Sequence, residues 1–203
     1  MKFVLATQNP NKKAELSAIL ADLGIEIVTE EELDIQVEVE ETGTSFAENA
    51  ALKAKAVMEA AGLPAIGDDS GLCVNALNGA PGIYSARYGG PEFDDRGRCN
   101  LLLEMMHGQT DRSAYFETVI VCALPNGDWF AARGQCHGAI AYTPMGSNGF
   151  GYDPVFFYTD KAKTFAQMDA AEKASVSHRG KALQSFKAKL VKYLAEHPEC
   201  GTL

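Results

Sequence analysis

Residues 3–28 read FVLATQNPNKKAELSAILADLGIEIV, and this stretch indicates the fold class. The apolar residues 3–6 predict a strand, and the polar residues 7–10 predict a loop after it. Apolar residues then recur at helical spacing from about residue 11, which predicts one buried stripe made of Leu16, Ile19, Leu20 and Leu23. We expect Gly24 to end this helix and residues 26–28 to form the next strand. A strand–loop–helix–strand unit packs helices on a sheet, so the sequence predicts a mixed α/β protein.

The rest of the chain continues this alternation. Ser45 and Glu48 have the spacing of a capping box, which predicts a helix that runs to about Ala61. The other expected elements are apolar strand-like segments at 72–77 and 155–158, a hairpin of strands 115–124 and 129–137 around the PNGD turn at 125–128, and helices at 100–106 and 181–196.

Composition restricts the classes of function. The chain has 203 residues, 46% of them hydrophobic, and a formal net charge of −9. Binding to a nucleic-acid backbone rests on lysine and arginine, so this acidic balance argues against a nucleic-acid partner. No apolar run approaches the roughly 20 residues of a membrane-spanning helix, and the amino terminus lacks the apolar core of a signal peptide. We therefore expect one cytoplasmic domain over residues 1–203 with no membrane partner.

The cysteines give no sign of a disulfide framework or a zinc site. They are five in number and have no CxxC spacing: Cys73, Cys99, Cys122, Cys136 and Cys200. This pattern predicts reduced thiols that act as small buried hydrophobic side chains.

The first polar cluster is TQNPNK at residues 7–12, between the first strand and its helix. Backbone amides at a helix start point outward and carry partial positive charge, and Lys12 adds a full charge. Thr7 and Asn9 can add side-chain hydrogen bonds. These groups suit a phosphate, although an ordinary capped turn has the same composition and no P-loop motif is present.

The second cluster is acidic. Glu40 and Glu41 precede one helix, and Asp68 and Asp69 belong to the sequence DDSG. Carboxylate oxygens are the ligands that Mg²⁺ takes in proteins, but DDSG is equally compatible with a turn. In an extended strand, successive side chains point to opposite sides, so Asp68 and Asp69 would have different roles.

Lys53 occupies an unusual position. Helical periodicity places it on the same side as the apolar Phe46 and the polar Asn49. Because burying an ammonium group without a partner is costly, Lys53 either extends to the edge of the apolar stripe or faces a site.

Two further clusters occur in the second half of the chain. Glycines flank Phe150 in GFGYDP at residues 149–154, which suits a flat ligand stacked on the ring or a glycine-rich turn with core aromatics. Lys173, His178 and Arg179 precede the last expected helix, and together they favour binding of an anion or a carbonyl group. A histidine alone is more often structural.

The clusters occur in one order, and the combination is specific. The motifs are TxNxxK at 7–12, EETG at 40–43, DDSG at 68–71, APGIYSARY at 80–88, GFGYDPVF at 149–156 and EKxxxSHRG at 172–180. Over residues 3–194 the chain resembles the Ham1/RdgB family of inosine/xanthosine triphosphate pyrophosphatases. The first loop departs slightly, because many members have a glycine after the threonine. The second glycine-rich loop also departs, with GSNGFGYD at residues 146–153.

The resemblance implies a fold and an activity. The fold would be an elongated mixed β-sheet with flanking helices, in two lobes around a central cleft. The activity would be Mg²⁺-dependent hydrolysis of deaminated purine nucleoside triphosphates (ITP, dITP and XTP) to the monophosphate and pyrophosphate, which cleanses the nucleotide pool. The enzyme would be a homodimer with at least one Mg²⁺ per subunit.

The resemblance also implies roles for individual residues. Asp69 would accept the proton of the attacking water, Asp68 would support it, and Lys53 would face the phosphates. Glu41 and Asp69 would hold Mg²⁺, with Glu40 less suited by one position. The substrate would contact Thr7, Gln8, Asn9, Pro10, Asn11, Lys12, Ser70, Phe150, Gly151, Tyr152, Asp153, Lys173, His178 and Arg179.

Selection for a 6-oxo purine would follow from hydrogen-bond donors aimed at O6, since an amino group there leaves those donors unpaired. Two alternatives stand beside this reading. A related pyrophosphatase could act on other modified nucleotides, and a nucleotide sensor could keep the fold without catalysis. The sensor is less consistent with a chain that retains Glu41, Lys53, Asp68 and Asp69. Residues 80–90 are a candidate dimer interface or a wall of the cleft.

Overall fold

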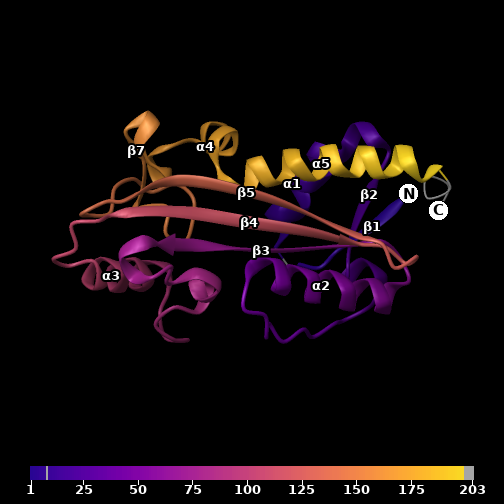
Figure 1. Ribbon diagram of the computed structural model, residues 1–203, viewed down its shortest axis with the longest axis horizontal. Helices are drawn as coiled ribbons and strands as arrows, with labels where there is room; N and C mark the ends of the chain where they lie inside the picture. The colour runs from indigo at the N-terminus through magenta and orange to yellow at the C-terminus, as the bar shows by residue number, and fades with distance from the viewer. Residues whose placement is uncertain (8, 199–203) are drawn as a thin grey trace. The chain divides into compact units, whose positions relative to one another are not determined.

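The computed structural model describes residues 1–7 and 9–198, without the side chain at position 10 (Figure 1). A seven-stranded sheet has the strand order β2-β1-β3-β4-β5-β6-β7. The strands are β1 (Lys2–Leu5), β2 (Glu26–Thr29), β3 (Ala65–Val74), β4 (Ser113–Ala123), β5 (Trp129–Ile140), β6 (Phe156–Tyr158) and β7 (Lys163–Thr164). The α-helices are α1 (Pro10–Leu20), α2 (Phe46–Ala61), α3 (Asp95–Met105), α4 (Ala170–Val176) and α5 (His178–Glu196).

The sheet is mixed, which confirms the predicted fold class. β1 pairs in parallel with both β2 and β3, whereas β6 pairs antiparallel with both β5 and β7. The opening strand–loop–helix–strand unit is present as predicted, and Gly24 follows the helix with a left-handed φ of 65°. The chain divides into two compact units, one of residues 1–69, 118–134 and 182–198 and one of residues 70–117 and 135–181.

The first unit has a helix layer on each face of its strands (Figure 1). Phe3 and Leu5 of β1 join a core with Leu16 of α1 and Phe186 of α5, whereas Val4 packs with Val57 of α2. Alternate residues of one strand therefore face different helices, as the period of two in a strand requires. The same alternation in β3 sends Ile66 to the α1 and α5 side and Ala65 to the α2 side.

Helix α2 lies very close to β3. A Cβ atom added at Gly67 would collide with the backbone of Ala50 and Ala54, both of which are fully buried. Glycine at 67 and alanines at 50 and 54 therefore permit a short distance between this helix and this strand. Polar side chains on the same face of α2 come within reach of the next α2-facing residue of β3, which is Asp69.

Several predicted boundaries are wrong, and each has a physical reason. DDSG is not a turn, because β3 continues through residues 68–71. The strand-like segment 72–77 is strand only to Val74 and ends in the short helix η3 (Asn75–Leu77). Helix α3 begins five residues earlier than expected, because Asp94 caps it by accepting from the Gly97 amide.

The polar sequence before the last predicted helix is also largely helical. Asp169 caps α4 by accepting from the Glu172 amide, and α5 begins at His178 rather than at residue 181. The capping box of α2 is half present. Ser45 accepts from the Glu48 amide, but Glu48 accepts from the amide and hydroxyl of Thr44.

The second unit has its own core. It contains Phe116, Tyr152, Phe156 and Phe165 among other buried apolar residues. The four cysteines in the described part of the chain are free and buried, as predicted, and Cys200 lies outside it. No helix among residues 1–7 and 9–198 is long and apolar enough to cross a membrane.

Candidate functional site

The start of α1 carries the first predicted cluster. Asn9 caps the helix by accepting from the Asn11 amide at 3.0 Å, and Thr7 Oγ1 accepts from the Asn9 amide at 3.3 Å. Asn9 and Asn11 are exposed, and Lys12 is half-buried. Gln8 and the side chain of Pro10 lie outside the described residues. The polar groups of this helix start are therefore available to an anion.

Lys12 Nζ contacts Asp68 Oδ2 at 2.7 Å, and the Asp68 side chain is only 3% exposed. The contact agrees with the alternation in β3, which turns Asp68 to the same side as Ile66 and α1. A charged pair at this distance holds the lysine head group near the amino end of α1.

A second group lies on the α2 side of the same strand. Lys53 Nζ contacts Glu41 Oε1 at 2.9 Å and Asp69 Oδ1 at 3.5 Å. The Lys53 side chain is 18% exposed, so it does not extend into solvent from the edge of the apolar stripe. Asn49, one helical turn earlier, donates to Asp69 Oδ2 at 3.2 Å. The structure therefore brings Glu41, Lys53 and Asp69 together and separates Asp69 from Asp68.

The carboxylates of Glu41 and Asp69 offer hard oxygen atoms to a cation. Among residues 1–7 and 9–198, no group of three or more His, Cys, Asp or Glu side chains is arranged to hold a metal. Mg²⁺ often takes only one or two carboxylates and completes its shell with water and substrate phosphates. Glu41 and Asp69 already flank the positive charge of Lys53, so the chemistry of this donor set fits a divalent cation.

The second unit gathers Phe150, Asp153 and Lys173. Lys173 Nζ contacts Asp153 Oδ2 at 2.5 Å and lies over the Phe150 ring, 4.8 Å from its centroid. Asp153 also accepts from the Phe150 amide at 2.9 Å. Burial raises the pKa of the Asp153 carboxyl, against the opposing effect of the Lys173 charge. Phe150 is 69% exposed, so its side chain is available to a flat ligand.

Not every residue of the GFGYDP loop presents its side chain to a ligand. Tyr152 is buried, and its hydroxyl donates to the Ser85 carbonyl at 2.9 Å. Burial raises the pKa of the Tyr152 hydroxyl. Gly151 donates its amide to Asp95 Oδ2 at 2.7 Å. Tyr152 and Asp153 therefore fix the conformation of the loop, and Phe150 is the side chain that the loop exposes.

His178 is the first residue of α5 and packs among aromatic rings. Its ring stacks on Phe116, with centroids 4.6 Å apart and an interplanar angle of 12°, and lies parallel to Phe165. Burial, together with the charges of Lys173, Arg179 and Lys181, lowers the pKa of His178 to about 3. His178 is therefore neutral at physiological pH and adds a hydrogen-bonding group rather than a charge. Its Nδ1 is buried and has no hydrogen-bond partner in the described part of the chain.

The remaining predicted residues are Ser70 and Arg179. Ser70 is half-buried in β3, directly after Asp69, and begins the second unit. Arg179 is half-buried next to His178. Sequence reasoning did not assign roles to Phe165, whose ring lies 5.5 Å from Lys173 Nζ, or to Ser85. The only sequence signal for Ser85 is its place in the APGIYSARY motif.

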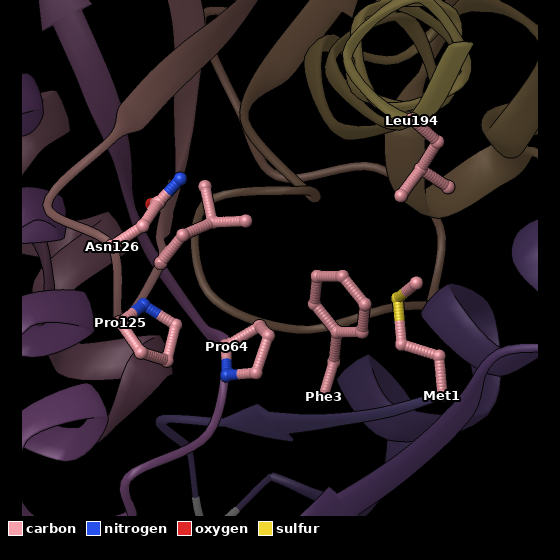
Figure 2. A pocket seen from close by; sticks show the side chains of 7 residues that line it. Met1, Phe3, Pro64, Pro125, Asn126 and Leu194 are labelled. Carbon is pink, nitrogen blue, oxygen red and sulfur yellow. The ribbon is translucent and has the colours of Figure 1, made fainter. Parts of the chain in front are cut away.

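A small apolar pocket of about 50 Å³ lies elsewhere in the first unit (Figure 2). Met1, Phe3 and Pro64 line it where β1 and β3 begin, together with Leu124, Pro125, Asn126 and Leu194. Lys12 lies in α1, which follows the carboxyl end of β1, and Asp69 lies in the middle of β3. Ligands of parallel sheets bind at the carboxyl ends of strands, whereas this pocket lies where the strands begin and most of its lining residues are apolar.

The fold and these polar groups define an α/β protein with an open mixed sheet, a helix start suited to an anion, and a lysine held between two carboxylates. The chain belongs to the Ham1 family, whose model matches residues 3–189.

Relatives match over nearly the whole chain. A protein from Exiguobacterium named dITP/XTP pyrophosphatase is 45% identical over 194 residues, which cover 96% of this chain and 99% of that protein. A Haemophilus influenzae protein of the same name is 48% identical, over 93% of this chain and 98% of its own. The solved structure of a HAM1 protein from Coxiella burnetii is similar with a TM-score of 0.91 and 41% identity, covering 95% of this chain and 99% of that one.

Proposed function

We propose that this chain hydrolyses deaminated purine nucleoside triphosphates, such as dITP and XTP, to the nucleoside monophosphate and pyrophosphate. The observation that carries the proposal is the position of Lys53 Nζ, 2.9 Å from Glu41 and 3.5 Å from Asp69. Phosphoryl chemistry depends mainly on positioning and on neutralising charge, and this group supplies both. Relatives named dITP/XTP pyrophosphatase over nearly the full chain support the same assignment.

The triphosphate would bind at the start of α1. The exposed Asn9 and Asn11, the backbone amides of the helix start and the Lys12 ammonium group favour phosphate oxygens there. Lys12 is held by Asp68 at 2.7 Å, so it is ordered before the substrate arrives. Less conformational entropy is then lost on binding.

Glu41 and Asp69 would hold Mg²⁺. When bound, Mg²⁺ would neutralise phosphate oxygens and lower the pKa of a coordinated water. Lys53 would place its charge on the same phosphates, and Asp69 would accept the proton of the attacking water. Asp68, on the other face of β3, would act through Lys12 rather than on the water.

The base and sugar would bind at the second group of residues. Phe150 would stack on the purine, and Lys173, His178 and Arg179 would supply donors for the 6-oxo group. A neutral His178 can donate from one ring nitrogen without attracting a phosphate. An adenine amino group would leave such donors unpaired, at a cost of about 1–3 kcal/mol for each buried donor. We also propose that the enzyme is a cytoplasmic homodimer; the free thiols of the described cysteines are consistent with a reducing compartment.

A steady-state rate panel tests the proposal. Purified protein with Mg²⁺ is assayed against ITP, dITP, XTP, GTP and ATP, and the products are separated. We expect pyrophosphate and monophosphate, and a kcat/KM for dITP, ITP and XTP well above that for ATP and GTP. Release of single phosphate would contradict cleavage between the α and β phosphates. A preference for a pyrimidine or another modified nucleotide would assign the chain to the alternative pyrophosphatase class.

A further inference from the structure

Asn49 contacts both segments that carry the candidate metal ligands. Its side chain is fully buried near the start of α2. The Asn49 Oδ1 atom accepts from the Gly43 amide at 2.9 Å, and Nδ2 donates to Asp69 Oδ2 at 3.2 Å. Gly43 is two residues after Glu41. One amide group therefore links the backbone beside Glu41 to the Asp69 carboxylate.

The chemistry of the two contacts requires an amide. The Gly43 amide can only donate, and an ionised Asp69 carboxylate can only accept, so the group between them needs both functions. An aspartate at position 49 would place a like charge beside Asp69. A leucine would have a similar shape and would make neither contact.

Asn49 and Lys53 contact different oxygen atoms of the Asp69 carboxylate. They are one helical turn apart on the same face of α2, so both reach toward β3. Lys53 contacts Oδ1 at 3.5 Å, and Asn49 donates to Oδ2. The rotation of the Asp69 carboxylate is therefore defined through both of its oxygens.

The approach of Gly43 to Asn49 leaves no room for a side chain. A Cβ atom added at Gly43 would lie 2.5 Å from Asn49 Oδ1 and 2.7 Å from Glu48 Cβ. Glycine is required at position 43 because there is no room for a side chain. Its backbone conformation does not require glycine, because φ is not in the left-handed region. The contact with Asn49 thus depends on the residue types at both positions.

We propose that Asn49 is a positioning residue that sets Glu41 and Asp69 in the geometry needed to hold a divalent cation. Asn49 acts through these carboxylates and does not itself contact the substrate. The inference rests on the proposed function for the identity of the reaction, while its contacts are independent of the nucleotide. Loss of partners that orient metal ligands typically costs about 10- to 100-fold in metal affinity or activity.

The test compares Mn²⁺ binding to nucleotide-free protein, measured by electron paramagnetic resonance of the free ion, in wild type and Asn49→Leu. We expect Asn49→Leu to bind Mn²⁺ about 10- to 100-fold more weakly. With dITP at saturating Mg²⁺ we expect kcat to fall while KM stays close to wild type, because residues 7–12 are untouched. The matched control is Thr118→Val, since Thr118 is fully buried and its Oγ1 has no hydrogen-bond partner among the described residues. We expect this control to bind Mn²⁺ like wild type.

Gly43→Ala is the second variant, in case Asn49→Leu fails to fold, and it should weaken Mn²⁺ binding in the same direction. Equal Mn²⁺ affinity in wild type and in a folded Asn49→Leu or Gly43→Ala variant would overturn the inference. Wild-type protein that binds no Mn²⁺ at millimolar concentration would overturn it as well. Failure of the proposed function has a different signature, because wild type would then bind Mn²⁺ and release no pyrophosphate from dITP.

Discussion

Asp68 and Asp69 are adjacent in β3 and contact lysines of different helices. Asp68 contacts Lys12 of α1 at 2.7 Å, and Asp69 contacts Lys53 of α2 at 3.5 Å. The cause is the period of two in a strand, which turns neighbouring side chains to opposite faces. Two identical carboxylates therefore have different environments, and we expect different kinetic roles for them.

The Asp69→Asn variant should lose almost all hydrolysis of dITP. Removing the proposed proton acceptor is expected to lower kcat by about 10²- to 10⁴-fold, with a small change in KM. Pyrophosphate release under saturating Mg²⁺ measures this. Asp34→Asn is the control, because Asp34 is exposed and has a left-handed φ of 53° that asparagine adopts readily. A kcat for Asp69→Asn within tenfold of wild type would rule out this role.

The Lys53→Met variant should lose rate through lost charge rather than lost folding. Removal of one preorganised electrostatic partner typically costs about 10²- to 10³-fold in kcat. Lys55→Met is the matched control on the same helix, since the Lys55 side chain is 70% exposed and pairs with the exposed Glu59. Rates for dITP and thermal unfolding of both variants give the comparison. Equal rates for the two variants would show that Lys53 is not part of the active site.

His178 should remain neutral across the pH range in which the enzyme works. Its folded pKa of about 3 lies below the ordinary value of 6.5, so the unfolded chain is protonated first as the pH falls. The contribution of His178 to stability is complete above about pH 6.5 and is lost as the pH falls toward 3. The slope of the unfolding free energy against pH cannot exceed about 1.4 kcal/mol per pH unit, because His178 binds at most one proton.

Two measurements check this expectation. The His178 ring protons in NMR spectra should not titrate between pH 5 and pH 8. Urea unfolding of His178→Asn should depend less on pH below 6.5 than unfolding of wild type. Titration of the His178 signals near pH 6.5 would contradict the stacked and buried environment beside Phe116.

Lys173 and Asp153 should show strong coupling in a double-mutant cycle. Lys173→Met leaves the carboxylate of Asp153, only 3% exposed, without its ammonium partner, and breaking a buried pair costs about 3–5 kcal/mol. Asp153→Asn in the same chain should recover much of that loss. Lys163→Met is the control, because its side chain is 44% exposed and exposed pairs contribute about 0–1 kcal/mol. Additive effects in urea unfolding would show that the pair is not coupled.

The sequence predicts well what depends on local periodicity. Alternation in a strand separates Asp68 from Asp69, and helical spacing places Lys53 on the inward side of α2. The opening unit and the PNGD hairpin follow from patterns of fewer than thirty residues.

Features that depend on contacts between distant residues were not predictable in this way. Tyr152 turns inward because Ser85, 67 residues earlier, accepts from its hydroxyl. Asn49 connects positions 43 and 69, and nothing in its immediate sequence shows that link. Helix α4 has seven residues and no buried stripe, so periodicity gives no signal for it.

The effect of a substitution at Gly67 is easily underestimated. It carries no functional group, and a change to alanine would look conservative by charge, polarity and size. Yet a single methyl group there would press on the backbone of α2 at Ala50 and Ala54 and push apart the helix and the strand that bring Lys53 to Asp69. A survey of natural variants that scores only chemically reactive positions would classify this substitution as neutral, although we expect it to move Lys53 away from Asp69.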